Sequence, residues 1–113
     1  MMRRIALGLL VLAAVAGLGC KASVTPIKTL LDDPARFDKQ TVRIAGTVQE
    51  AVGILGYGAY RVSDGTGVLL VATQENGAPR TGAQVGVEGE FRAAFTLGTE
   101  TGAVLMEKRR YTP

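Results

Sequence analysis

Histidine and tryptophan are absent from this 113-residue chain, and cysteine occurs only once, at position 20. Without histidine the chain lacks the side chain that most often serves as a general base or a metal ligand. A single cysteine excludes an internal disulfide. The remaining candidates for catalysis are Ser63 beside Asp64 and the pair Glu88 and Glu90, which we interpret as a turn and a solvated strand face. We therefore expect no enzymatic activity, no cofactor and no metal site.

An excess of charge of either sign is also missing once the first residues are set aside. Of the 13 basic residues, Arg3 and Arg4 come first, so that 11 basic residues stand against 10 acidic ones in the rest of the chain. A near-neutral domain lacks the basic excess typical of nucleic-acid-binding proteins, and we do not expect a nucleic acid as partner. One basic cluster remains. Lys108-Arg109-Arg110 is either a solvated strand end or a site of attraction to anionic headgroups or to cell-envelope polymer.

The chain contains one long apolar segment, which runs from Ile5 to Gly19 directly after Arg3 and Arg4. Two positive charges before a short apolar segment that ends in small residues are typical of a secretory signal. A membrane-spanning helix needs about 20 residues, so this segment is short for a permanent span. We therefore predict that the chain is exported.

The only cysteine lies where the apolar segment ends. Gly17-Leu18-Gly19-Cys20 resembles the lipobox of bacterial lipoproteins, in which a diacylglycerol is attached to the cysteine and the chain is cleaved just before it. The resemblance implies a palmitate-type anchor on Cys20 that holds the protein to a membrane, facing the periplasm or the cell exterior. Lys21 favours the outer membrane, because that family often has Asp there in inner-membrane proteins. An ordinary secreted protein and an uncleaved anchor are the alternatives.

The chain is thus divided into a signal peptide (1–19), a lipidated cysteine with a short tether (20–25) and one domain (26–113). Pro26 can open a helix with Thr25 as its N-cap, and Pro34 ends this helix. From Thr41 the apolar residues recur with a period of two, and Gly46 indicates a bulge or a sharp bend. The predicted strands cover residues 41–48, 60–62, 68–73, 85–92 and 101–108, with a hairpin turn at 63–67. This pattern predicts an all-β fold, a small five-stranded closed barrel preceded by one short helix.

Three motifs of this domain resemble bacterial oligonucleotide/oligosaccharide-binding domains, the OB folds. They are Ile27-x-x-Leu30-Leu31-x-x-Pro34-x-x-Phe37-x-x-Gln40-x-Val42-x-Ile44-x-Gly46-x-Val48, Tyr60-x-Val62-x-Asp64-x-Thr66-Gly67-x-Leu69-x-Val71 and Gly82-x-x-Val85-x-Val87-x-Gly89. The resemblance implies a five-stranded barrel, whose turns and core these positions occupy. Because this fold serves many ligands, it implies little about function.

A glycine-rich tract, Gly53-Ile54-Leu55-Gly56-Tyr57-Gly58, joins the first two predicted strands. In OB folds the corresponding loop commonly borders the ligand face. We therefore take Ile54, Leu55 and Tyr57, with Arg61 on the strand that follows, as candidate binding residues. The alternative is that the loop side chains cap the open end of the barrel.

Six aromatic residues are available for ligand contacts or for the core. Phe37, Tyr60 and Phe91 fall on core positions, which leaves Tyr57, Phe95 and Tyr111 as candidate exposed rings. The sequence thus predicts a membrane-anchored envelope lipoprotein whose OB-like barrel is a non-enzymatic binding module for a protein or a small envelope ligand. The alternative is an OB domain that binds oligosaccharide or nucleic acid.

Overall fold

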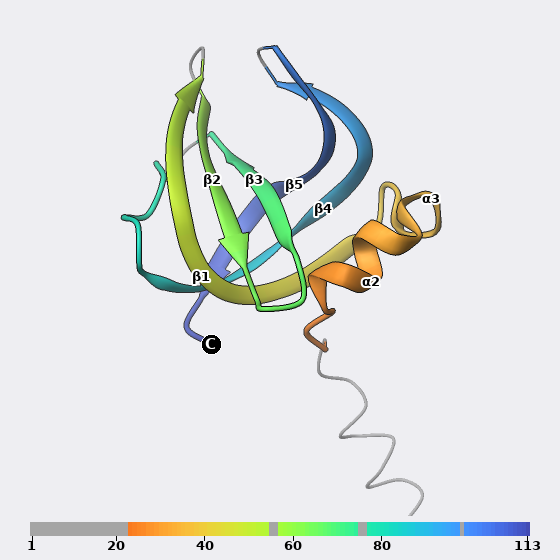
Figure 1. Ribbon diagram of the computed structural model, residues 1–113, viewed down its shortest axis with the longest axis horizontal. Coiled ribbons are helices and arrows are strands. Elements are labelled where there is room, and N and C mark those ends of the chain that lie inside the picture. The colour runs from red at the N-terminus through yellow and green to blue at the C-terminus, as the bar shows by residue number, and fades with distance from the viewer. Residues whose placement is uncertain (1–22, 55–56, 75–76, 98) are drawn as a thin grey trace, which may run out of the picture.

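The computed structural model describes residues 23–54, 57–74, 77–97 and 99–113 (Figure 1). In this part of the chain two short helices precede five strands. The helices are α2, Ile27–Asp32, and α3, Pro34–Phe37. The strands are β1, Thr41–Ile54, β2, Tyr57–Ser63, β3, Val68–Thr73, β4, Gln84–Leu97, and β5, Glu100–Tyr111. The order of the strands matches the expectation from sequence, but two helices are present where one was expected, and β1, β2, β4 and β5 are longer than the alternation indicated.

The five strands close into a barrel in the order β1-β2-β3-β5-β4. β3 and β5 pair in parallel, and the other neighbours pair antiparallel. Closure gives each strand a neighbour on both sides, which removes the exposed edges at which sheets tend to aggregate. The structure therefore confirms the predicted small five-stranded barrel with a short helix at its N-terminal side (Figure 1).

β1 is long enough to serve two neighbours. Its first half pairs with β4 and its second half with β2, and Thr47 pairs with both. Next to this changeover, a Cβ on Gly46 would collide with the backbone carbonyl of Ser63, so that glycine alone allows β2 to approach this closely. At Gly46 we expected a bulge or a sharp bend. The bulge lies at Gln49, where the register shifts, and Gly46 is needed for the close approach of β2.

The barrel interior is filled from all five strands and from α2. Alternate strand residues point inward, as the period of two predicted. The largest fully buried side chains include those of Tyr60, Phe91, Ile27, Leu30, Ile44, Leu69 and Leu105. Phe37 packs against this core and is half buried. The buried hydrophobic residues of the described part lie between Ile27 and Leu105, so we expect the chain from 21 to 113 to fold on its own.

The first turn of α2 is held by a turn far along the chain. Asp64 Oδ2 accepts a hydrogen bond from Ile27 N at 2.9 Å, and the next backbone N–H donates to Thr66 Oγ1 at 3.1 Å. The expected N-cap at Thr25 is wrong, because no side chain next to the helix caps it. Thr25 N instead donates to the carbonyl of Arg43 at 2.8 Å, which joins the start of the domain to β1.

One carboxylate is buried inside the barrel, where the side chain of Glu107 is 1% exposed. Arg110 Nε donates to it at 2.7 Å and Thr73 Oγ1 at 2.9 Å, and the Tyr60 hydroxyl is a third donor. Burial, followed by the hydrogen bond to Glu107, raises the pKa of Tyr60 well above its ordinary value, so that the hydroxyl keeps its proton. Arg110 also donates to the carbonyl of Gly77 and ties the β3–β4 connection to the barrel.

Candidate ligand-binding groove

One outer face of the barrel is apolar in its middle and basic at its two edges. The strand register places Arg61 of β2 beside Leu70 of β3. It places Val104 of β5 between Leu70 and Arg92 of β4. The middle of this row belongs to a second apolar cluster, separate from the barrel core, that consists of Ala59, Leu70, Ala72 and Val104 with Phe95 and Met106 packed against it.

A groove of about 370 Å³ lies along this row. Three large hydrophobic side chains are exposed in the described part of the chain, and two of them, Leu31 and Val68, line the groove. Apolar side chains that gather in a concave surface mark a contact site more often than isolated ones do. The other lining residues that matter for its chemistry are Arg61, Leu70, Phe95, Gly102 and Val104.

The groove contains one aromatic residue, Phe95, and the glycine that pairs with it, Gly102, leaves open space beside the ring. Phe95 of β4 lies opposite Gly102 of β5, and a Cβ built on Gly102 would meet no atom within 4 Å. The ring of Phe95 is half buried, and Arg92 Cζ lies 5.8 Å from its centroid. The groove thus contains one ring, with a cation stacked on it and open volume beside it.

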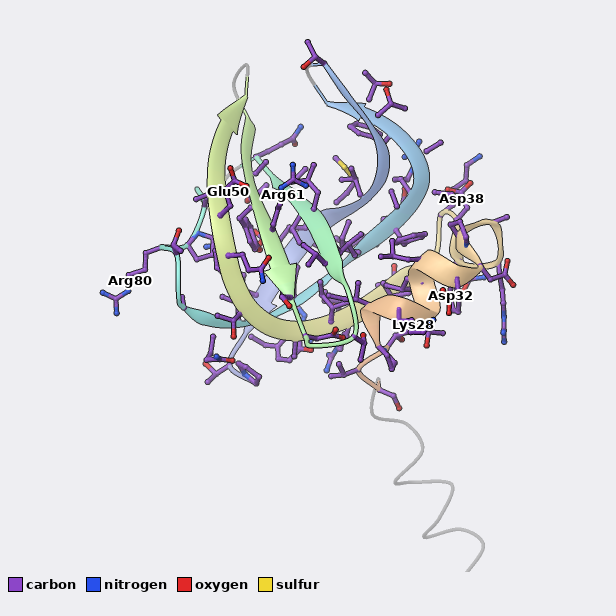
Figure 2. All side chains as sticks on the ribbon, in the orientation of Figure 1. Lys28, Asp32, Asp38, Glu50, Arg61 and Arg80 are labelled. Carbon is purple, nitrogen blue, oxygen red and sulfur yellow. The ribbon has the colours of Figure 1, made fainter. Side chains whose placement is uncertain are left out.

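Each of the two arginines has a carboxylate partner. Arg61 Nε lies 3.4 Å from Glu50 Oε2, and Arg92 Nη1 lies 3.0 Å from Glu90 Oε1. Figure 2 shows the first pair side by side on β1 and β2. Because all four side chains are at least a third exposed, each ion pair contributes at most about 1 kcal/mol. An anionic ligand can therefore compete for either guanidinium.

The structure brings one of the candidate binding residues into the groove, which is Arg61. Ile54 and Tyr57 pair with each other at the joined ends of β1 and β2. Their side chains, and the whole of Leu55, lie outside the described residues, so that the choice between a cap and a contact site stays a prediction. Cys20 also lies outside the described residues, and its lipidation stays a prediction too.

Sequence reasoning missed the apolar centre of the groove. Phe95 was a candidate exposed ring, but Leu70 and Val104 were not singled out. The available signal is the uninterrupted apolar run of β3, VLLVAT. A strand that is apolar on both faces is covered on both faces, and here the outer cover is the second cluster.

A larger hollow of about 560 Å³ lies around Gly46, Asp64 and Gln84. Three of its polar side chains are already engaged, since Asp64 holds α2 and Gln84 Nε2 donates to Thr47 Oγ1 at 2.6 Å. It includes no aromatic side chain and no basic one. We therefore place the candidate site in the smaller groove.

Among the residues that the structure describes, no group of three or more His, Cys, Asp or Glu side chains is placed so that it could hold a metal ion. No helix in this part is long and apolar enough to cross a membrane.

Comparison with known proteins bears on the fold. No family model and no curated protein matches the chain. Aspartyl tRNA synthetase from Entamoeba histolytica superposes with a TM-score of 0.64 and 14% identity over 79% of this chain and 21% of its own. Asparaginyl-tRNA synthetase from Pyrococcus horikoshii gives a TM-score of 0.58 and 21% identity over 68% of this chain and 20% of its own. OBody AM3L09, solved bound to hen egg-white lysozyme, gives 0.54 and 17% identity over 67% of this chain and 83% of its own.

The chain has an OB fold. It spans about a fifth of the length of the synthetases that it resembles, and identities this low show the fold alone. The similarity nevertheless corrects one expectation, because we did not expect a nucleic acid as partner and the solved structures with this fold include enzymes named for tRNA. That expectation was wrong because it relied on net charge. A partner meets one surface, and Arg61 and Phe95 in the groove lie on the same face as Arg92, which neighbours the Phe95 ring.

Proposed function

We propose that this OB domain is a non-enzymatic binding module whose groove holds a single-stranded nucleic acid. The observation that carries the proposal is the row Arg61–Leu70–Val104–Arg92 with Phe95 beside it, an apolar floor and ring between two guanidinium groups. Single-strand binders combine aromatic side chains, on which bases stack, with basic groups that follow the backbone. The resemblance to tRNA synthetases supports the same class of ligand.

The dimensions of the row suit a short stretch of such a strand. Arg61 and Arg92 are three strand positions apart in the sheet order, which is about 14 Å at roughly 4.8 Å per strand. Both arginines exchange a carboxylate for a phosphate when the ligand binds. Two phosphate contacts predict that log K falls with log salt concentration with a slope of about −1.4.

A protein partner is the second candidate, and a different observation favours it. Leu31 and Val68 are exposed aliphatic side chains at the rim of the groove. Aliphatic side chains contribute to protein contacts, whereas bases stack on flat rings. The resemblance to the OBody that was solved bound to lysozyme supports this candidate as well.

Fluorescence anisotropy of a labelled single-stranded oligonucleotide with the chain 21–113 tests the first candidate. Phe95→Ala should weaken binding by about 5- to 150-fold, because one base–aromatic stack contributes about 1–3 kcal/mol. Gly102→Leu should fill the groove. Because a Cβ at position 102 meets no atom within 4 Å, the variant should keep its melting temperature. Unchanged affinity in a Gly102→Leu protein of unchanged stability contradicts the site.

Arg61→Gln and Arg80→Gln form a matched pair, since each removes one positive charge. Arg80 is exposed in the connection before β4 and points away from the barrel (Figure 2). The first substitution should weaken binding and reduce the salt slope by about 0.7, and the second should leave both nearly unchanged. Equal effects indicate attraction by net charge alone. A neutral oligosaccharide that displaces the oligonucleotide assigns the groove to sugars instead.

We propose separately that the domain is exported and held to a membrane by acyl chains on Cys20. The support is the sequence of the first 20 residues, in which the only cysteine follows an apolar segment and two arginines. Each buried CH₂ contributes about 0.8 kcal/mol, so that two or more chains hold a small domain firmly. Metabolic labelling with a palmitate analogue should mark the unmodified chain and not Cys20→Ser, and equal labelling of both contradicts the anchor.

A further inference from the structure

A second charged face lies on the outside of β1, β4 and β5, away from the groove. The strand register places Arg43 of β1 beside Glu88 of β4, and Glu88 beside Arg109 of β5. Arg43 Nε lies 2.8 Å from Glu88 Oε1, and Arg109 Nε lies 3.0 Å from Glu88 Oε2. The hydrogen bonds from Arg109 and Arg43 lower the pKa of Glu88 to about 2, so that it stays ionised. Two cations thus share one anion, and the three side chains keep one net positive charge.

Lys108 adds a second net charge to this face. The register shifts between Glu88 and Gly89, so that Lys108 is the extra residue of β5. Its side chain is exposed, and Lys108 Nζ donates to Thr41 Oγ1 at 2.9 Å, a neutral partner. The bulge turns Lys108 and Arg109 outward while Arg110 binds Glu107 inside the barrel.

Arg43 of this face is held in place by Tyr111. The ring of Tyr111 packs against Gly86 so closely that a Cβ there would collide with it. The Tyr111 hydroxyl donates to the carbonyl of Ile44 at 3.1 Å, and Arg43 Cζ lies 5.1 Å from the centroid of the ring. Arg43 is thus held between this ring and Glu88. A preorganised cation loses little conformational freedom when it binds an anion.

The same face marks the place where the domain joins the residues that precede it. Val24 forms a parallel bridge with Arg43, and Thr25 N donates to the Arg43 carbonyl. From Cys20 to Val24 the backbone spans at most about 14 Å at roughly 3.5 Å per residue. The start of α2 and the C-terminus lie on one side of the barrel, opposite the joined ends of β1 and β2 (Figure 1). An acylated Cys20 therefore holds this face close to the headgroups.

We propose that Arg43, Lys108 and Arg109 form a docking face for the anionic lipid headgroups of the membrane that carries the protein. The inference rests on the proposed anchor at Cys20 for its geometry, and on the charges of the folded domain for its chemistry. Docking through Arg43 of β1, Glu88 of β4 and the 108–109 part of β5 leaves the groove, on β2, β3 and the other ends of β4 and β5, open to solution. The tether and the face together thus orient the binding site away from the bilayer.

Vesicle co-sedimentation of the chain 21–113, which lacks the acyl anchor, tests the face by itself. Vesicles of phosphatidylcholine and phosphatidylglycerol in equal parts should bind the domain, and vesicles of phosphatidylcholine alone should not. Each basic residue near an anionic surface contributes about fivefold in affinity, so that Lys108→Gln/Arg109→Gln should bind about 25-fold more weakly. Glu88 keeps Arg43 as partner in this variant, so the fold should be retained.

Lys108→Gln and Arg80→Gln form a matched pair of test and control, because each removes one exposed positive charge. The first should lose about fivefold in vesicle affinity, and the second should lose less than about twofold. Equal losses, or equal binding to both kinds of vesicle, overturn the docking face.

The oligonucleotide assay separates this inference from the proposed function. Lys108→Gln/Arg109→Gln should bind the oligonucleotide like the unmodified domain, whereas Phe95→Ala should bind vesicles normally. Loss of oligonucleotide binding in the Lys108/Arg109 variant assigns the face to nucleic acid and overturns membrane docking. Vesicle binding by the domain, together with an absence of palmitate labelling of Cys20, supports the docking face and contradicts the proposed acyl anchor.

Discussion

Asp64 connects three parts of the domain through one side chain, and its removal gives a sharp test of the fold. Oδ2 accepts a hydrogen bond from Ile27 N at 2.9 Å. Oδ1 accepts from Thr66 N at 2.9 Å, from Thr66 Oγ1 at 2.6 Å and from Gly67 N at 3.2 Å. The carboxylate therefore closes the β2–β3 turn and also serves as the N-terminal cap of α2, although the helix begins 37 residues earlier in the chain.

The cost of Asp64→Ala follows from these contacts. Loss of an N-cap typically costs about 0.5–2 kcal/mol, and each lost turn bond about 0.5–1.5 kcal/mol before water replaces it. Because the turn is largely exposed, we expect water to recover part of the second contribution. The predicted loss is about 2–3 kcal/mol in the free energy of unfolding. Asp64→Asn keeps one acceptor oxygen and should lose about 1 kcal/mol.

Urea unfolding of the chain 21–113, followed by far-ultraviolet circular dichroism, measures these losses. Ser63→Ala is the matched control, since its hydroxyl makes one long bond of 3.4 Å to Gly65 N in the same turn. It should cost less than about 0.5 kcal/mol. If Asp64→Ala costs no more than Ser63→Ala, the turn does not hold α2.

The contribution of Asp64 to the stability of the domain should depend on pH. Partial burial raises the pKa of Asp64, but the hydrogen bonds from Thr66, Ile27 and Gly67 outweigh it and hold the pKa below its ordinary value. A carboxyl group with a lowered pKa in the folded state stabilises the protein above its unfolded pKa of about 3.9. That stability is lost as the pH falls through the folded value. The difference in stability between the unmodified domain and Asp64→Asn should therefore shrink below about pH 4, and a difference that is constant down to pH 2 contradicts the mechanism.

Four other substitutions test two separate features of the structure, the close approach at Gly46 and the buried charge of Glu107. Gly46→Val should lower the free energy of unfolding by more than about 2 kcal/mol, because its side chain meets the Ser63 carbonyl. Gly102→Val adds its side chain in open space and should cost less than about 1 kcal/mol. Equal melting temperatures of the two variants refute the close approach. Arg110→Met should cost about 3–5 kcal/mol in urea unfolding, because it leaves the buried Glu107 without its cation. Arg110→Met/Glu107→Gln should recover much of that loss, and a double variant no more stable than the single one argues against an uncompensated charge.

The barrel could be predicted from the sequence because its signals are local. The period of two after Thr41, the helix that stops before Pro34 and the hairpin turn at 63–67 each need only neighbouring residues. The role of Asp64 could not be predicted in this way. Its sequence neighbours indicate an ordinary turn residue, and none of them indicates that its second carboxylate oxygen binds the start of a helix 37 residues away.

The site was harder to predict than the fold, because register decides it. The row from Arg61 to Arg92 exists only through the pairing of Leu70 with Val104 in parallel strands, which sequence patterns do not specify. The cluster at 108–110 shows the same limit, since a bulge sends Lys108 and Arg109 outward and Arg110 into the barrel. A run of three basic residues gives no sign of that division.

Mapping of backbone amide shifts in the isotope-labelled chain 21–113 during titration with a single-stranded oligonucleotide tests the central claim most directly. We predict that the largest shifts fall on the groove, at Arg61, Leu70, Phe95 and Val104, and that Gly102→Leu abolishes them in a protein that is still folded. Shifts confined to Arg43 and Arg109 on the second charged face, or no shifts at ligand concentrations that saturate other single-strand binders, would contradict the proposed site.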